Sequence, residues 1–239
     1  MQRRLRPTTL MALVLAGAVT LLAGPAAARE ERVVTIGDVE LTVALADGDC
    51  FFDPDQPADH GLMEQLKVAT GPAFVPLLAF GDCDRIPGWR NGDPPSLHRF
   101  GYFMIAEAHL EPVFAFDQPT LADAIAQALA DRSATDYKAD IAHLADDLAK
   151  VWTTLPAGGK QELGILHGDR YGPVLATVLS VAGSDGTPFP RVMLHQSVLL
   201  HGKVLSVVAL RDYRDSESIF DAYGDLSAVV EATAARNPN

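Results

Sequence analysis

The fold is decided by residues 161–213, which read "QELGILHGDRYGPVLATVLSVAGSDGTPFPRVMLHQSVLLHGKVLSVVALRDY". Apolar runs rich in Val and Leu alternate there with short turn-forming groups, a pattern typical of antiparallel strands joined by tight turns. The turn-forming groups are Gly168-Asp169, Ser184-Asp185-Gly186 and Gly202-Lys203. The stretch therefore predicts a four-stranded antiparallel meander.

Helical periodicity follows the meander directly. From Ser216 to Ala235, apolar residues recur at the spacing of one face of an α-helix. The residues expected to be buried against the sheet are Ile219, Phe220, Tyr223, Leu226 and Val230. A second helical pattern covers residues 119–155, and a shorter one covers residues 57–70.

The N-terminal part of the chain adds further strands. Two β-branched runs joined at Gly37-Asp38 predict a hairpin. Residues 74–83 predict a strand that tolerates Pro76 only at an edge or a bulge, and residues 100–105 predict an aromatic strand. Antiparallel strands with packed helices predict an α+β fold, with helices on one or both faces of the sheet.

The first 28 residues predict a cleaved signal peptide of the general secretory (Sec) type. Arginines at positions 3, 4 and 6 precede an apolar run from Leu10 to Ala23, and Ala26-x-Ala28 fits a cleavage site. Because this run is shorter than a membrane span of about 20 residues, we expect no stable membrane insertion after cleavage. We expect a periplasmic or secreted bacterial protein, with residues 29–239 as a single globular domain.

The charge of the chain argues against nucleic acid as a partner. The chain has 19 basic and 31 acidic residues, a formal net charge of −12. Cleavage after Ala28 removes three arginines and leaves 16 basic against 31 acidic residues, or −15. Nucleic-acid binding depends on clustered Lys and Arg. The glycine-rich and zinc-protease motifs of common cofactor and metal sites are also missing from the sequence, so no cofactor is expected and an enzyme is disfavoured without being excluded.

Cys50 and Cys83 are the two cysteines of the chain, each at the end of a Gly-Asp-Cys tripeptide. In an oxidising compartment such a pair favours a disulfide, which would stabilise the fold by about 3 to 4 kcal/mol in the chain-entropy model. A zinc site needs further ligands at short spacing. A catalytic thiol needs a nearby cation, whereas Asp49, Asp82 and Asp84 flank these sulfurs. We therefore predict a structural disulfide.

The acidic residues near the cysteines leave a second interpretation open. A hard-cation site of the calcium type is built from carboxylates, and several occur here: Asp47, Asp49, Asp53, Asp55, Asp82 and Asp84. Their spacing does not match the known calcium-binding loop, and aspartates also serve as solvated turn and helix-cap residues. The sequence leaves the presence of a metal undecided.

Trp89, Arg90 and Phe100 form a candidate binding loop. Trp89 and Arg90 lie between two glycine-containing turns, and Phe100 opens the aromatic strand. Long loops that carry an aromatic residue and an arginine often hold binding groups. The alternative is structural, with Trp89 covering the disulfide and Arg90 neutralising the acidic residues beside the cysteines.

A polar cluster is predicted where the first and third turns of the meander meet at one end of the sheet. It contains His167, Asp169, Arg170 and His201. Two imidazoles and a carboxylate suit a metal site or acid–base chemistry. Turns also collect polar residues for solvation alone, so this cluster supports only a secondary hypothesis.

The order of elements, ending in the long helix "SESIFDAYGDLSAVVEATAARN" (residues 216–237), resembles the α/β/α sandwich of PsbP-like proteins. These are exported or lumenal accessory factors, and the resemblance covers residues 33–237 and transfers no site residues. The cysteine pair followed by "WRNG" (residues 89–92) is also similar to an uncharacterised family of exported bacterial proteins. The resemblance implies a non-catalytic binding or accessory protein whose partner is an envelope protein or another envelope component. The alternative is a secreted metal-dependent or hydrolytic enzyme that uses the turn end of the meander.

Overall fold

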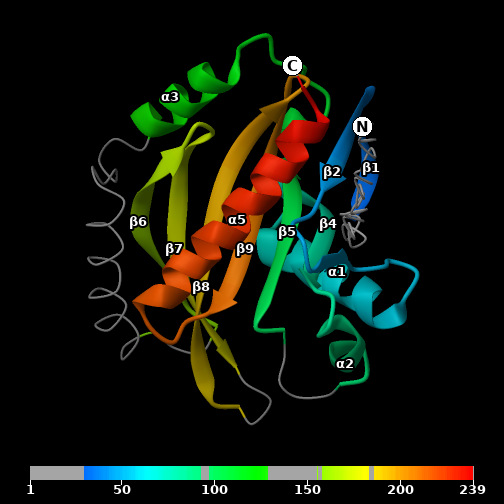
Figure 1. The fold of residues 1–239 in the computed structure, drawn as a ribbon, viewed down its shortest axis with the longest axis vertical. Coiled ribbons are helices and arrows are strands. Elements are labelled where there is room, and N and C mark those ends of the chain that lie inside the picture. The colour runs from blue at the N-terminus through cyan, green and yellow to red at the C-terminus, as the bar shows by residue number, and fades with distance from the viewer. Residues whose placement is uncertain (1–29, 93–96, 129–154, 156–157, 183–185, 239) are drawn as a thin grey trace, which may run out of the picture.

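The computed structural model describes residues 30–92, 97–128, 155, 158–182 and 186–238. The predicted signal peptide, and residues 129–154 of the second helical pattern, lie outside the described residues. Within them the protein is a mixed α+β fold, built on an antiparallel sheet (Figure 1). No helix of the described residues is long and apolar enough to cross a membrane.

The main sheet has seven strands in the order β3-β4-β5-β9-β8-β7-β6. The predicted meander forms one half of it, and β5 pairs with β9 to join the other half. The meander strands are β6 (Lys160–Asp169), β7 (Gly172–Ala182), β8 (Pro188–Leu200) and β9 (Lys203–Asp212). The other strands are β3 (Asp49–Phe51), β4 (Phe74–Asp82) and β5 (Arg99–Ala106).

Two meander turns lie at positions other than those predicted. The β8–β9 turn is His201-Gly202, where both residues have positive φ, 46° and 77°. Such a two-residue hairpin turn needs left-handed backbone at both positions, so the glycine is its second residue. The β6–β7 turn is Arg170-Tyr171, because Gly168 lies in a bulge of β6 and Asp169 already pairs with Gly172. Of the third turn, residues 183–185 lie outside the described residues.

Helix α5 (Ser216–Arg236) packs across one face of the main sheet (Figure 1). It begins with a capping box in which Asp215 accepts from the Ser218 backbone N–H, an arrangement that satisfies donors left open at a helix start. The prediction that Phe220 is buried was wrong, because its side chain is 41% exposed. The buried stripe runs through Ile219, Ala222, Leu226, Val229 and Val230, one position away from Phe220.

Helix α1 (Pro57–Thr70) packs against the opposite face of the sheet, as its Leu66 joins Tyr102, Met104 and Val208 in a second apolar cluster. The first cluster lies between the sheet and α5 and contains Phe103, Leu194 and Leu205. Apolar burial on both faces supplies the main favourable contribution to folding. The predicted strand over residues 74–83 is present as β4. It tolerates Pro76 as expected, because β4 is bulged between Pro76 and Leu78.

The predicted N-terminal hairpin is present as a separate two-stranded sheet. Its strands are β1 (Glu31–Ile36) and β2 (Val39–Ala44). The hairpin lies beside the C-terminal part of α5, where Thr233 bonds both backbone groups of Ala44, and Asn237 does the same at Thr42. The two side chains therefore satisfy β2 backbone groups that the pairing of β2 with β1 leaves open.

One end of the sheet, here called the turn end, carries the β6–β7 and β8–β9 turns. It is covered by α3 (Gln118–Ala128) and by the segment after η1 (Glu107–His109) (Figure 1). Lys203 is fully buried there and donates from Nζ to the carbonyls of Leu110, Glu111 and Pro112, at 2.6, 3.1 and 3.1 Å. A buried ammonium needs such acceptors, so this lysine fixes the covering segment.

Candidate functional site

The predicted disulfide between Cys50 and Cys83 is present. Cys50 lies in the short strand β3, and Cys83 follows the last residue of β4. Because β3 pairs with β4 over only Asp49, Cys50 and Phe51, the covalent bond fixes a strand that has few hydrogen bonds of its own.

The candidate binding loop is partly packed into the second apolar cluster. Trp89 lies on the short helix α2 (Ile86–Arg90), with its ring 5.2 Å from that of Phe52 in an edge-to-face arrangement. Phe100 lies in β5, and its ring is stacked on Tyr102 at 6.5 Å. Both side chains are half-buried.

One interpretation of the sequence was that Arg90 neutralises the acidic residues beside the cysteines. The structure gives Arg90 a different partner. Its guanidinium forms a bidentate pair with the fully buried Asp59 of α1, with Nε 2.9 Å from Oδ1 and Nη2 2.5 Å from Oδ2. Such fork geometry is favoured between arginine and carboxylate. Asp59 also accepts the backbone N–H of Asp53, so Arg90 joins α2 to α1.

The residues of the predicted polar cluster have separate local partners. Asp169 accepts from the Tyr171 N–H, from Nε2 of Gln196 and from the Ser227 hydroxyl. The Arg170 guanidinium lies over the Tyr171 ring at 4.9 Å. His201 is exposed in its turn, with Nε2 3.4 Å from the Pro238 carbonyl. His167 lies in β6, and its side chain is outside the described part of the chain.

The aspartates near the cysteines act mainly as turn and ion-pair residues. Asp53 accepts the N–H of Asp55, and Asp82 accepts the N–H of Asp84. Asp49 is buried and faces Arg99. Among the residues that the structure describes, no three His, Cys, Asp or Glu side chains are placed to hold a metal ion.

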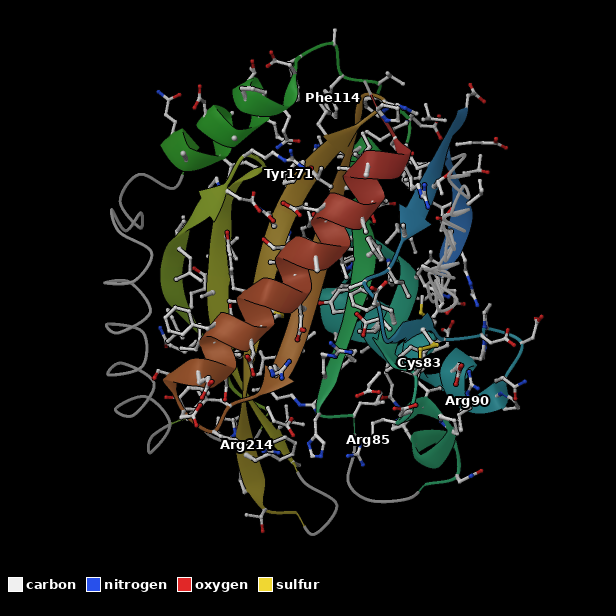
Figure 2. The ribbon with its side chains drawn as sticks, viewed as in Figure 1. Cys83, Arg85, Arg90, Phe114, Tyr171 and Arg214 are labelled. Atoms are coloured by element: carbon white, nitrogen blue, oxygen red, sulfur yellow. A yellow bond between two sulfur atoms is a disulfide. The ribbon has the colours of Figure 1, made fainter. Side chains whose placement is uncertain are left out.

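A pocket of about 390 Å³ lies at the end of the sheet opposite the turn end. We call it the charged pocket; its lining residues are Asp82, His98, Arg99, Arg211, Asp212, Arg214, Ser218 and Asp221. They come from the end of β4, the start of β5, the end of β9 and the first turns of α5. Figure 2 shows Arg214 at this end of the molecule, below the start of α5.

One side of the charged pocket is a chain of ion pairs below α5. Arg99 lies 2.6 Å from Oδ1 of Asp49 and donates to Oδ1 of Asp225 at 3.0 Å. Arg211 donates to Oδ2 of Asp225 at 2.5 Å and contacts Asp221 at 3.0 Å. Three strands and the helix are therefore tied together by alternating charges, which holds the pocket wall in place before any ligand arrives.

Asp49 is the most perturbed acid of this chain of ion pairs. Its side chain is only 1% exposed, and burial raises its pKa to about 6 against the opposing charge of Arg99. The neighbouring carboxylates of Asp225 and Asp82 raise the pKa further. Burial disfavours a charged carboxylate because it removes solvating water, so Asp49 takes up a proton in mildly acidic solution.

The other side of the pocket holds an oriented imidazole. Nδ1 of His98 lies 2.6 Å from Oδ2 of Asp212, whose Oδ1 accepts from Nε of Arg191 at 2.8 Å. An imidazole oriented by a carboxylate can move a proton at its second nitrogen. Ser218 lines the same pocket, but its hydroxyl accepts the Arg214 N–H and donates to Asp215. It therefore serves as a helix cap and is not poised as a nucleophile.

Sequence reasoning did not identify the charged pocket. Its residues are single polar positions at the ends of separate elements, and no short motif contains them. The available signal was the dense run "RDYRDSES" (residues 211–218), where a buried strand passes into a helix. The pocket forms because the non-local pairing of β5 with β9 brings Arg99 opposite Arg211.

No family model matches the chain, and no curated protein matches it. Among solved structures, a point mutant of the protein Mog1 is 10% identical, with a TM-score of 0.28 over 87% of this chain and 94% of that chain. A protein from Rhodobacter sphaeroides solved by structural genomics is 12% identical, with a TM-score of 0.18 over 60% of this chain and 91% of that chain. These TM-scores are too low to carry an argument about function.

Proposed function

We propose that the protein is a periplasmic or secreted, non-catalytic binding or accessory protein of the cell envelope, and that its partner docks at the charged pocket. The first 28 residues support export, and the disulfide fits an oxidising compartment. Helices on both faces of the sheet support the α/β/α sandwich of PsbP-like accessory proteins. That part of the proposal rests on the order and layering of elements.

The observation that carries the proposal is the state of the pocket's charges. Most of them are already paired with one another, so the wall is fixed, yet the Arg214 guanidinium forms no ion pair or side-chain hydrogen bond with any described residue. Such a lining is suited to binding, because the paired side chains need no ordering and only the exposed Arg214 side chain loses freedom on association.

The alternative, a metal-dependent or hydrolytic enzyme at the turn end, receives less support. All three contacts of Asp169 are structural, to the turn backbone, to β8 and to α5. His201 bonds the C-terminal backbone. These side chains are committed to the fold, so the charged pocket is the better candidate for interaction.

Two measurements test the proposal. The chain is expressed in a bacterium with its own first 28 residues, and the periplasmic fraction is analysed by intact-mass spectrometry with and without reduction. We expect the mass of residues 29–239, about 2 Da below that of the reduced chain. Unprocessed protein with alkylatable thiols in the cytoplasm would contradict export.

Binding is tested with a photo-cross-linking amino acid at Glu217, an exposed residue in the first turn of α5. Exposed Glu231, in the C-terminal half of the same helix, is the matched control. We expect a cross-linked envelope component of defined mass from position 217 and none from position 231. Equal cross-linking at both positions, or none at 217, would contradict a partner at the charged pocket.

A further inference from the structure

The lining of the charged pocket carries both signs of charge in equal number, three arginines and three aspartates. Most are neutralised within the protein. Asp212 is held by Arg191 and His98, and Asp221 by Arg211. A pocket built in this way has no large excess of either sign.

Two charges are left without an ion pair to any described residue. One is the exposed Arg214 guanidinium, and the other is the half-buried Asp82 carboxylate, which accepts the backbone N–H of Asp84 and interacts with the charge of Arg99 without a direct contact. They lie on different walls, because Asp82 ends β4, and Arg214 follows the end of β9. Since β5 lies between β4 and β9, these two strands are two strand spacings, about 10 Å, apart, and Arg214 lies two residues beyond the end of β9.

Both residues are held by rigid parts of the fold. Asp82 precedes Cys83 of the disulfide, and its strand neighbour is Asp49. Arg214 precedes the N-cap of α5, where the helix dipole adds positive potential. The backbones of both charged residues are therefore fixed, whereas the Arg214 side chain is exposed and its length reduces the separation between the two charges.

From this arrangement we propose that the charged pocket binds a small zwitterion of the amino-acid type, a free amino acid or a dipeptide, with its carboxylate at Arg214 and its ammonium at Asp82. This inference deepens the proposed function and rests on it. The pocket volume of about 390 Å³ is near the lower end of ligand sites. Only a short ligand carries both terminal charges within such a space.

Ligands with a single charge fit this pocket less well. A simple anion would meet Arg214 but also face the carboxylates of Asp82 and Asp221, on a protein whose formal net charge is −12. A simple cation would be repelled by Arg214. A zwitterion satisfies both unpaired charges at once, so neither is left desolvated without a partner.

The test is calorimetric titration of the disulfide-bonded protein purified from a periplasm. The probes are the individual amino acids and Ala-Ala, with propionate and ethylamine as the carboxylate-only and ammonium-only analogues. We expect at least one amino acid or dipeptide to bind at least about tenfold more tightly than both analogues. A tenfold change in the dissociation constant corresponds to about 1.4 kcal/mol in binding free energy. This comparison needs no variant and so does not depend on how a variant folds.

Variants then locate the site. Arg214→Gln and Asp82→Asn should each weaken zwitterion binding about tenfold or more. The matched controls are Arg85→Gln and Asp84→Asn, two exposed residues next to the pocket but outside its lining, which should change the affinity less than about twofold.

Three results would overturn the inference: no binding of any probe at about 10 mM, an affinity for propionate or ethylamine equal to that for the zwitterion, or equal effects of the control and pocket variants. A dissociation constant above about 10 mM would correspond to binding too weak to count as a site. Failure here with specific cross-linking retained at position 217 removes the zwitterion alone. Failure of both experiments removes the proposed function as well.

Discussion

The two ends of the sheet use charged side chains in different ways. At the turn end, Lys203 and Asp169 are each saturated by three hydrogen bonds to groups of the fold. At the opposite end, the charged pocket pairs most of its charges but leaves Arg214 and Asp82 without an ion pair in the part of the chain that the structure describes. Buried charge thus closes the fold at the turn end, whereas the opposite end keeps an exposed arginine and a half-buried aspartate, on which the proposed binding rests.

The largest loss of stability is expected from a substitution at the turn end. Lys203→Met removes the ammonium from three carbonyls and leaves them without a donor in a buried site. We expect a loss of about 3 to 5 kcal/mol in the free energy of unfolding, measured by urea denaturation. Lys67→Met, at an exposed lysine paired with Glu64, is the control and should change stability by less than about 0.5 kcal/mol. A loss below about 1 kcal/mol for Lys203→Met would mean that the turn end does not depend on this charge.

Removing the disulfide tests the pocket end. The double variant Cys50→Ser, Cys83→Ser should lose about 3 to 4 kcal/mol, because the unfolded chain regains the entropy of the open loop. Reduction of the unmodified protein with dithiothreitol should give a similar shift in the urea midpoint. If the double variant is as stable as the oxidised protein, the bond adds nothing to the anchoring of β3.

Asp49 makes the pocket end sensitive to pH. Its folded-state pKa of about 6 exceeds the unfolded value of 3.8, so between these values the folded protein holds a proton that the unfolded chain releases. Stability from this group is therefore present below about pH 4 and lost as the pH rises through 6. We therefore compare the free energy of unfolding of the unmodified protein with that of Asp49→Asn. The unmodified value minus the variant value should fall by up to about 3 kcal/mol from pH 4 to pH 7.

Denaturation curves at several pH values measure this change. Asp38→Asn, in the exposed turn of the N-terminal hairpin, is the matched control and should give a pH profile parallel to that of the unmodified protein. An unchanged difference between the unmodified protein and Asp49→Asn across this range would show that Asp49 stays ionised beside Arg99.

The smallest expected effect distinguishes the paired from the unpaired arginine of the charged pocket. Arg211→Gln breaks contacts to Asp221 and Asp225 and should cost about 1 to 2 kcal/mol. Arg214→Gln should change stability by less than about 0.5 kcal/mol, because its guanidinium has no partner among the described residues. Thermal melting of both variants measures the difference. Equal destabilisation would place Arg214 in the structural network.

Local patterns in the sequence were sufficient for most elements. The meander strands, α1 and the stripe of α5 follow from periodicity that a single segment contains. The disulfide followed from composition and the expected compartment. Errors arose where one residue decides the geometry. Gly168 occupies a bulge instead of the turn, and Phe220 lies beside the buried stripe rather than in it.

The charged pocket could not be predicted for a different physical reason. It depends on the pairing of β5 with β9, whose paired residues lie 100 to 112 positions apart in the chain. Arg99 and Arg211 look like ordinary strand ends until that pairing sets them side by side below Asp225. The predicted cluster of His167, Asp169, Arg170 and His201 was inferred from adjacent turns, and adjacency alone does not reveal which hydrogen bonds each side chain already makes.

The hydrogen bonds from Thr233 and Asn237 to β2 join segments that are far apart in the chain. The sequence separations are 189 residues for Thr233 and Ala44 and 195 residues for Asn237 and Thr42. Contacts of such long sequence separation form slowly, because a long loop must close first. Docking of the N-terminal hairpin therefore waits for the C-terminal part of α5, and deletion of residues 233–238 should leave the hairpin undocked.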